Sequence, residues 1–284
     1  MLSSSLAKIV NGLRTAQGLD FNVWIAEAFK SLHLNAEVIQ ETQAESDVIA
    51  EALFAEEPYY VVIEGQAVRN HNEVGYDKLG QLRGNFPSYM DERRQKLFKN
   101  AYKLVVGRPR FSSDARRRAE PDVVLITDQT FTQLLEIHSR FRFSQDELEL
   151  LFKREDNLTY GEIELPIISR HLLTPKVRRI NVIALVLYCL GAGTERRKWL
   201  PVQQVIGMAK VYGRFLKIDL GDEEIMNAIL DLQSSLLRLI LRRDDRIRFI
   251  SIPVETIKSL IPIGGEILSN LSEFSERLSS LEKT

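Results

Sequence analysis

The chain has 284 residues, of which 44% are hydrophobic and 27% are charged, a composition typical of a globular protein with a packed core. The formal net charge of −1 excludes a uniformly basic nucleic-acid-binding protein, although clusters of arginine are compatible with one basic face. The single cysteine, Cys189, excludes an intramolecular disulfide framework and a multi-cysteine zinc site, and its apolar neighbours in the sequence favour a buried thiol.

The amino terminus and the apolar segments indicate where the protein acts. The first residues, "MLSSSLAKIVNGLRTAQG", lack the long apolar stretch and the cleavage site of a signal peptide. The longest apolar run, around residues 180 to 190, is too short to cross a bilayer. We therefore expect an intracellular, cytoplasmic protein with no membrane partner.

Strand and helix patterns alternate through the first half of the chain, after an N-terminal helical extension expected over residues 1–20. The strand patterns predict β-strands over 36–43, 46–54, 59–68, 101–109 and 118–127. The helical patterns predict helices over 21–34, 128–141 and 144–155, and a helical or loop stretch over 75–98. Asp128 is the expected N-cap of one helix, and Ser144 with Glu147 has the spacing of a capping box. This succession predicts an α/β domain with a mixed sheet flanked by helices over residues 21–156.

A connector over 157–171 separates this domain from a second one. Helices are predicted over 176–193, over 200–216 with Pro201 in the first turn, and over 221–240; a strand–turn–strand pattern follows over 241–253. Three helices followed by a β-hairpin is the element order of a winged helix, which we predict over 172–255. A helical tail over 256–284 completes the chain, with an apolar seam formed by Ile267, Leu271, Phe274, Leu278 and Leu281.

One predicted strand, "YYVVIEGQAV" over 59–68, contains polar residues within an apolar run. The period of a β-strand places Glu64 and Gln66 on the same face. Asp47, at the start of the preceding strand, could bring a second carboxylate beside Glu64 if the two strands are antiparallel neighbours. Two carboxylates form a hard-oxygen site suited to Mg²⁺, for which Mn²⁺ can substitute, and such a site serves phosphodiester hydrolysis. Taken alone, the same three residues also fit a strand with one face in water.

The pattern Asp47-x(16)-Glu64-x-Gln66 after an amphipathic helix resembles the PD-(D/E)xK nuclease superfamily, and the order of elements over 21–160 is similar to the cleavage domain of FokI-like type II restriction endonucleases. The resemblance implies a restriction-endonuclease-like fold with Asp47 and Glu64 as metal ligands. It places Gln66 where the family usually has a lysine, and Glu27 where some members have a further acid. Lys78 or Lys103 could supply the missing positive charge.

The resemblance implies a Mg²⁺-dependent endonuclease that hydrolyses double-stranded DNA. Expected phosphate contacts lie in both domains: Gln81, Arg83, Arg178, Arg179, Arg196, Arg197, Lys198, Arg242 and Arg243. A homodimer is expected because one such site cuts one strand. Two alternatives stay open: a transposon-end or recombination nuclease on the same fold, and an inactive DNA-binding protein, since glutamine cannot replace the charge of lysine.

Two further motifs are not expected to carry chemistry. His71, His138 and His171 lack the spacing of zinc ligands relative to one another or to the cysteine. Gly191 and Gly193 follow a predicted helix, and no Walker lysine comes after them, so they are interpreted as a helix stop rather than a nucleotide loop.

Overall fold

The computed structural model describes residues 4–40, 46–68, 72–86, 92–119, 122–153, 162–190, 199–215, 218–233 and 240–249. The chain divides into two compact units, Met1–Thr174 and Pro175–Thr284. Each unit has a hydrophobic core of its own, so each is described by itself.

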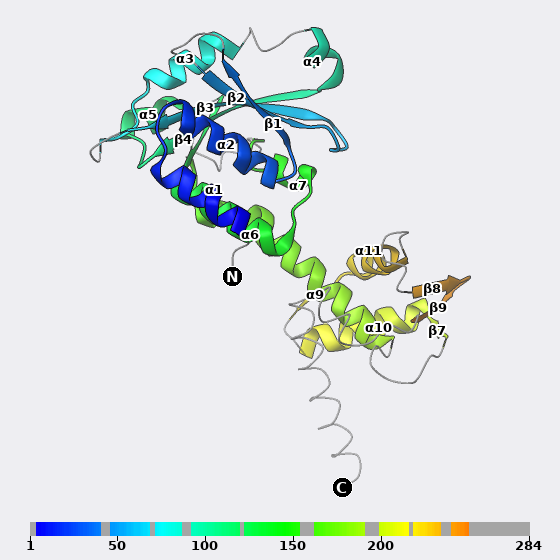
Figure 1. Ribbon diagram of the computed structural model, residues 1–284. Helices are drawn as coiled ribbons and strands as arrows, with labels where there is room; N and C mark the ends of the chain where they lie inside the picture. The colour runs from blue at the N-terminus through cyan, green and yellow to red at the C-terminus, as the bar shows by residue number, and fades with distance from the viewer. Residues whose placement is uncertain are drawn as a thin grey trace. The chain divides into compact units, whose positions relative to one another are not determined.

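Unit 1 is built around a six-stranded sheet in which strand order follows chain order (Figure 1). Its strands are β1 (Asn35–Gln40), β2 (Ser46–Ala52), β3 (Tyr59–Ala67), β4 (Asn100–Arg108), β5 (Val123–Thr127) and β6 (Glu162–Ile163). Strands β1, β2 and β3 are antiparallel to one another, whereas β3, β4, β5 and β6 run parallel. The central strand β3 is buried over its first six residues, as expected where helices cover both faces of a sheet.

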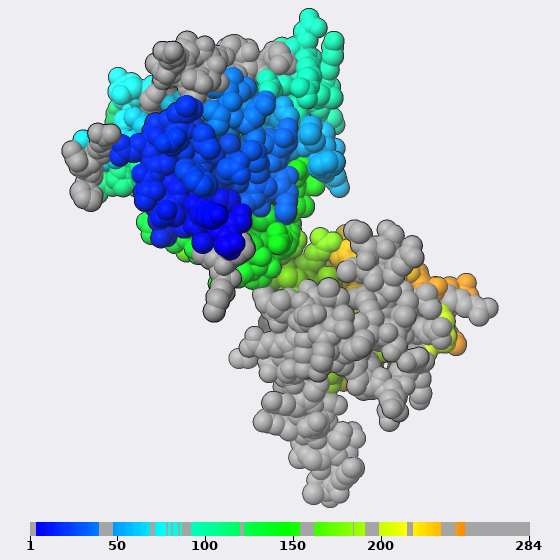
Figure 2. Space-filling model, in the orientation of Figure 1, coloured from blue at the N-terminus to red at the C-terminus, as the bar shows by residue number. Residues whose placement is uncertain are grey.

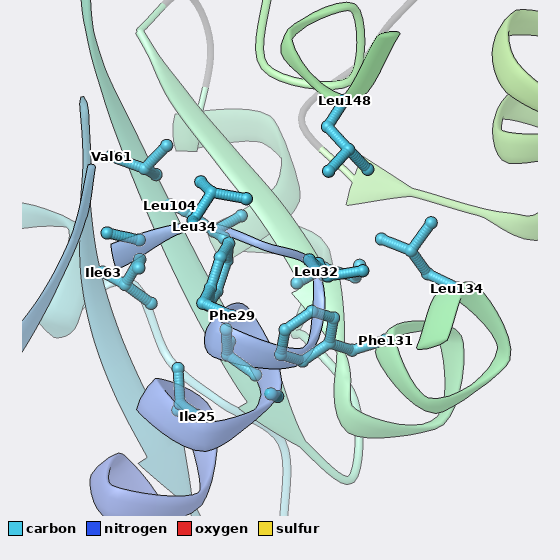
Figure 3. Packing of buried hydrophobic residues seen from close by; sticks show 14 of the residues in the cluster. Ile25, Phe29, Leu32, Leu34, Val61, Ile63, Leu104, Phe131, Leu134 and Leu148 are labelled. Atoms are coloured by element: carbon cyan, nitrogen blue, oxygen red, sulfur yellow. The ribbon is translucent and has the colours of Figure 1, made fainter. Parts of the chain in front are cut away.

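Helices cover both faces of this sheet. One face packs against α1 (Ser4–Thr15), α2 (Leu19–Ser31), α6 (Asp128–Phe141) and α7 (Gln145–Glu149). The side chains of Phe29 from α2, Val61 from β3 and Phe131 from α6 meet in this core (Figure 3). The other face packs against α3 (Asp77–Asn85) and α5 (Ser113–Ala119), with α4 (Glu92–Leu97) preceding β4. The mixed sheet flanked by helices confirms the predicted α/β class.

The N-terminal segment is part of the first core. Leu13 and its buried neighbours in α1 pack against α2 and α6, and α1 and α2 form much of the visible surface in Figure 2. Arg108, the last residue of β4, donates hydrogen bonds to the backbone oxygens of Leu13 and Ala16, at 2.7 and 2.5 Å. A guanidinium at the carboxyl end of a helix complements the helix dipole, so this contact fixes the end of α1 to the end of β4.

Several local predictions can be compared with the structure. The capping box of Ser144 and Glu147 is confirmed at the start of α7. The N-cap of α6 is Thr127 rather than Asp128, because the Thr127 hydroxyl accepts from the Thr130 N–H. The arginine-rich segment before β5 forms α5, a helix that was not predicted from the sequence. Within the predicted linker 157–171, β6 pairs with β5 and therefore belongs to the sheet.

A helical stretch leads from β6 toward the second unit. It consists of α8 (Leu165–Ile168), the π-helical turn η2 (Ser169–Leu173) and α9 (Thr174–Cys189). None of the helices within the described ranges is long and apolar enough to span a membrane.

Unit 2 contains α9, α10 (Val202–Phe215) and α11 (Asp222–Gln233), followed by the hairpin strands β8 (Ile240–Arg243) and β9 (Arg246–Phe249). A short strand, β7 (Leu200–Pro201), pairs with β9, so the sheet order is β7-β9-β8 and all pairings are antiparallel. Pro201 therefore lies in β7 and not inside α10. Cys189 is buried, and burial raises the pKa of its thiol to about 12. Apart from β7, the described elements follow the predicted order. The assignment to a winged helix stays a prediction, and the tail over 256–284 lies outside the described residues.

Candidate active site

The polar residues of β3 point away from α2. A methyl group at Gly65 would overlap the side chains of Asn22 and Ile25 of α2, so Gly65 faces that helix. Because successive side chains of a strand alternate between the two faces, Glu64 and Gln66 face the side covered by α3 and α5. The sequence prediction that both share a face agrees with this register.

Glu64 is a buried carboxylate, with only 5% of its surface exposed. A charged side chain in the interior is destabilising unless it is paired, hydrogen-bonded or bound to a cation. Two residues further along, Gln66 is half-buried, and its Oε1 atom is fully buried. Within the described part of the chain, that oxygen has no hydrogen-bond partner. Glu64 therefore does not face water, which was the alternative interpretation of this strand. The face of β3 toward α3 carries two polar side chains with acceptor oxygens.

Asp47 lies in β2, the neighbour of β3. The β2–β3 register pairs Ile49 with Val62 and Val48 with Ile63, and one further step in the same antiparallel register sets Asp47 opposite Glu64. Directly opposed residues in such a ladder have Cα atoms about 4.5 to 5.5 Å apart. The backbone therefore brings the two predicted ligand positions together, while the side chain of Asp47 lies outside the described part of the structure.

Glu27 is not placed beside these residues. It lies on α2, which covers the opposite face of the sheet, and its carboxylate pairs with Lys30 at 2.7 Å. Its side chain is 43% exposed. The expected role of Glu27 as an additional acid does not fit this geometry, because the sheet separates α2 from the face of Glu64.

Of the two lysines expected to supply charge, Lys103 can be located. It lies on β4 in register with Val62, and its ammonium donates to Asp122 Oδ2 at 2.8 Å and lies 4.5 Å from the centre of the Phe86 ring. The side chain of Lys78 is not described. In the structure the ammonium group of Lys103 is therefore held by Asp122.

Asp122 also binds Arg83, whose guanidinium donates to Asp122 Oδ1 at 2.6 and 2.9 Å and to the backbone oxygen of Arg118. Burial alone would raise the pKa of Asp122, but hydrogen bonds from Arg83 and Lys103 outweigh it and hold that pKa below its usual value. Arg83, expected to contact phosphate, thus joins α3 to the start of β5. The sequence did not reveal the role of Asp122, because its partners lie far away in the chain.

In unit 2, two of the predicted phosphate-binding arginines are paired with acids of α11. Arg178 binds Glu224 at 2.5 and 2.9 Å, and Arg179 binds both carboxylate oxygens of Asp231 at 2.8 and 2.9 Å. The exposed Arg242 donates to the backbone oxygen of Asp244 in the hairpin turn. The remaining predicted contacts have no described side chain: Gln81, Arg196, Arg197, Lys198 and Arg243.

Two surface features were not assigned a place in the fold from the sequence. Arg110 and Arg117 are 64% and 79% exposed, and α5, which carries Arg117, covers the same face of the sheet as Glu64. A cleft of about 580 Å³ lies between α9 and α11, with the Arg178 and Arg179 ion pairs in its lining. Neither could be predicted from local patterns, because both depend on which helices pack together.

A metal site with three or more acidic, histidine or cysteine ligands is absent from the described side chains, a set that does not include Asp47. His138 is buried in α6 beside the rings of His33 and Phe143, so its position is that of a core residue. His171 lies in η2, and His71 lies outside the described residues.

Comparison with known proteins gave few matches. No family model and no curated protein sequence matches the chain. A solved structure similar to this chain is that of the DNA modification-dependent restriction endonuclease AspBHI, with a TM-score of 0.34 and 15% sequence identity. The similarity covers 49% of this chain and 37% of that chain, well under two thirds of its length.

Proposed function

We propose that this protein is a divalent-metal-dependent nuclease that hydrolyses phosphodiester bonds in double-stranded DNA, with Asp47, Glu64 and Gln66 at its centre. The observation that carries the proposal is the buried carboxylate of Glu64 on the central strand, which the β2–β3 register, continued by one step, sets opposite position 47 of β2. A buried carboxylate with a second acid on the adjacent strand is the arrangement that the PD-(D/E)xK resemblance implies.

The residues present fit a hard divalent cation such as Mg²⁺, with Mn²⁺ as a substitute. Glu64 and Asp47 would hold it through carboxylate oxygens, and Gln66 Oε1, which has no partner among the described residues, offers a further acceptor. When bound, such a cation supplies charge stabilisation at the phosphate and acidifies a coordinated water. Tyr60 and Val62, buried on the same face of β3, exclude bulk water from one side of the site.

The proposed substrate is DNA because exposed arginines border this face. Arg117 on α5 and Arg110 before it are available for phosphate contacts in competition with Asp114 and Glu73. Unit 2 is proposed as a second contact through a winged helix. A homodimer is proposed for double-strand cleavage, since each chain supplies one Asp47–Glu64 pair.

A second candidate function is favoured by Gln66 itself. A neutral amide in place of lysine neither supplies positive charge nor removes a proton, which fits a DNA-binding protein that has lost catalysis. Metal-dependent strand cleavage separates the two functions.

The test uses supercoiled plasmid incubated with the purified full chain and Mg²⁺ or Mn²⁺. We expect nicked and linear products that disappear with chelator. Glu64→Gln should reduce the cleavage rate by at least about a hundredfold, the upper range found for ligand-supporting residues. Glu56→Gln, an exposed acid in the β2–β3 turn, is the matched control and should cleave normally. Metal-independent DNA binding without cleavage would favour the second function.

A further inference from the structure

The amide oxygen of Gln66 is a buried acceptor without a donor in the described part of the chain. Buried acceptors in folded proteins are nearly always satisfied, by protein, by water or by a bound group. The side of β3 on which it lies is partly covered by packing. Gln66 is paired with Gly107 of β4, and the ring of Phe111 packs where a side chain of Gly107 would be. Among the described residues this oxygen is therefore an acceptor open to a bound group.

The neighbouring carboxyl group favours a cation as that ligand. An amide oxygen accepts from donors or binds cations, and Glu64, two residues away on the same face, is a buried carboxyl group of the kind that binds hard cations. Amide carbonyl oxygens are regular ligands of hard divalent cations, alongside carboxylates. Lysine, the usual residue of the resembling family here, could not bind a cation, so the substitution changes what this position can do.

The strand geometry permits both side chains to reach one ion. Residues two apart on a strand are separated by about 6.6 Å along its axis. Metal–oxygen distances for Mg²⁺ are about 2.1 Å, and the side chains of Glu and Gln are long enough to converge between their backbone positions. The β2–β3 register, continued by one step beyond Val48 and Ile63, sets position 47 opposite Glu64.

We infer that Gln66 Oε1 is a direct ligand of the divalent cation held by Glu64, so that the site combines two carboxylates with one neutral amide. The inference rests on the proposed function. It also accounts for the glutamine at position 66. A lysine there would repel the ion, whereas the glutamine has an oxygen that binds it.

Calorimetric titration of the full chain with Mn²⁺ and Mg²⁺, without DNA, tests the inference. Gln66→Met keeps the length of the side chain and removes the amide oxygen; we expect Mn²⁺ affinity to fall by at least about tenfold. Gln66→Glu adds a full charge at the same reach and should tighten binding, with an affinity that rises with pH as the new carboxyl group ionises. Gln129→Met, at an exposed position of α6, is the matched control and should bind as the wild type does.

Thermal melting distinguishes ligation from a structural role. Without metal, Gln66→Met should melt at or above the wild-type temperature, because it removes an unsatisfied buried acceptor. The rise in melting temperature on adding Mn²⁺ should shrink in the same variant. A lower melting temperature without metal, together with wild-type metal affinity, would show that the amide is structural. If Gln66→Met does not fold, Gln66→Glu decides, and binding no tighter than wild type overturns the inference.

Failure of the proposed function and failure of the inference about Gln66 give different results. Absence of cation binding by the wild type would overturn the metal-dependent function together with this inference. If Glu64→Gln lost cation binding while Gln66→Met bound as the wild type does, the proposed function would stand. Only the inference that Gln66 is a ligand would then be refuted.

Discussion

Gly65 of β3 and Asn22 of α2 are in direct contact, and the space between backbone and amide side chain leaves no room for a Cβ atom. Asn22 is buried, with 4% of its surface exposed. This close approach fixes the side of the sheet to which β3 presents Gly65, and therefore the opposite side to which it presents Glu64 and Gln66.

Gly65→Ala is therefore expected to lower the free energy of unfolding by about 1–3 kcal/mol, the usual cost of adding a methyl group to a packed interior. Urea denaturation at neutral pH measures this change in the free energy of unfolding. The control is Gly80→Ala on α3, where a Cβ meets nothing within 4 Å and the gain in helix propensity should stabilise the protein. Equal stability of the two variants would contradict the close packing of α2 on β3.

Asp122 should make stability depend on pH. Its carboxyl group has a lowered pKa in the folded protein. Its contribution to the free energy of unfolding is therefore fully present above the pKa of about 3.9 in the unfolded chain, and it is lost as pH falls through the pKa of the folded protein. Asp122→Asn should lower the free energy of unfolding by about 1 kcal/mol at pH 7, the upper value for a partly exposed ion pair. Melting temperatures of the two proteins should converge toward pH 3.

A melting-temperature difference that stayed constant from pH 7 to pH 3 would show that the Asp122 contacts to Arg83 and Lys103 do not contribute through charge. Glu56→Gln serves as the control for acid titration in general, because Glu56 is an exposed residue of the same unit.

The acids of α11 should limit DNA binding by unit 2. Glu224 and Asp231 neutralise Arg178 and Arg179, so replacing both acids by Glu224→Gln and Asp231→Asn frees two guanidinium groups. We expect tighter binding to duplex DNA, and a log–log salt slope steeper by about 0.9 for each added phosphate contact. Fluorescence anisotropy over a range of salt concentrations measures both quantities.

The converse variant, Arg178→Gln with Arg179→Gln, should leave wild-type binding little changed if the acids already occupy these side chains. Unchanged affinity and slope in the acid-substituted protein would place the DNA contact elsewhere than α9.

Double-strand cleavage is expected to need two copies of the chain. Mixing wild type with an excess of Glu64→Gln should convert linear plasmid products to nicked ones, because most wild-type chains are then in mixed dimers that carry one working site. Gel analysis of supercoiled plasmid, with total protein held constant, gives the ratio of nicked to linear product. Undiminished linear product in that mixture would show that one chain cuts both strands.

Local patterns in the sequence determined much of unit 1. The alternation within "YYVVIEGQAV" predicted β3 and the shared face of Glu64 and Gln66, since strand periodicity requires only neighbouring residues. The Ser144–Glu147 capping box was equally local. The error at Asp128 had a local cause too, because both Thr127 and Asp128 are residue types that cap helices and only the backbone geometry selects between them.

The tertiary structure decided everything that depends on partners distant in the chain. The α2 contact at Gly65 set which face of the sheet carries Glu64, and so separated Glu27 from it. The pairing of Lys103 and Arg83 with Asp122, like that of Arg178 with Glu224, joins side chains that no short motif connects. A sequence pattern specifies the period of a strand or helix, but the partners of a charged side chain follow from packing, because ion pairs form between whichever opposite charges the folded backbone brings together.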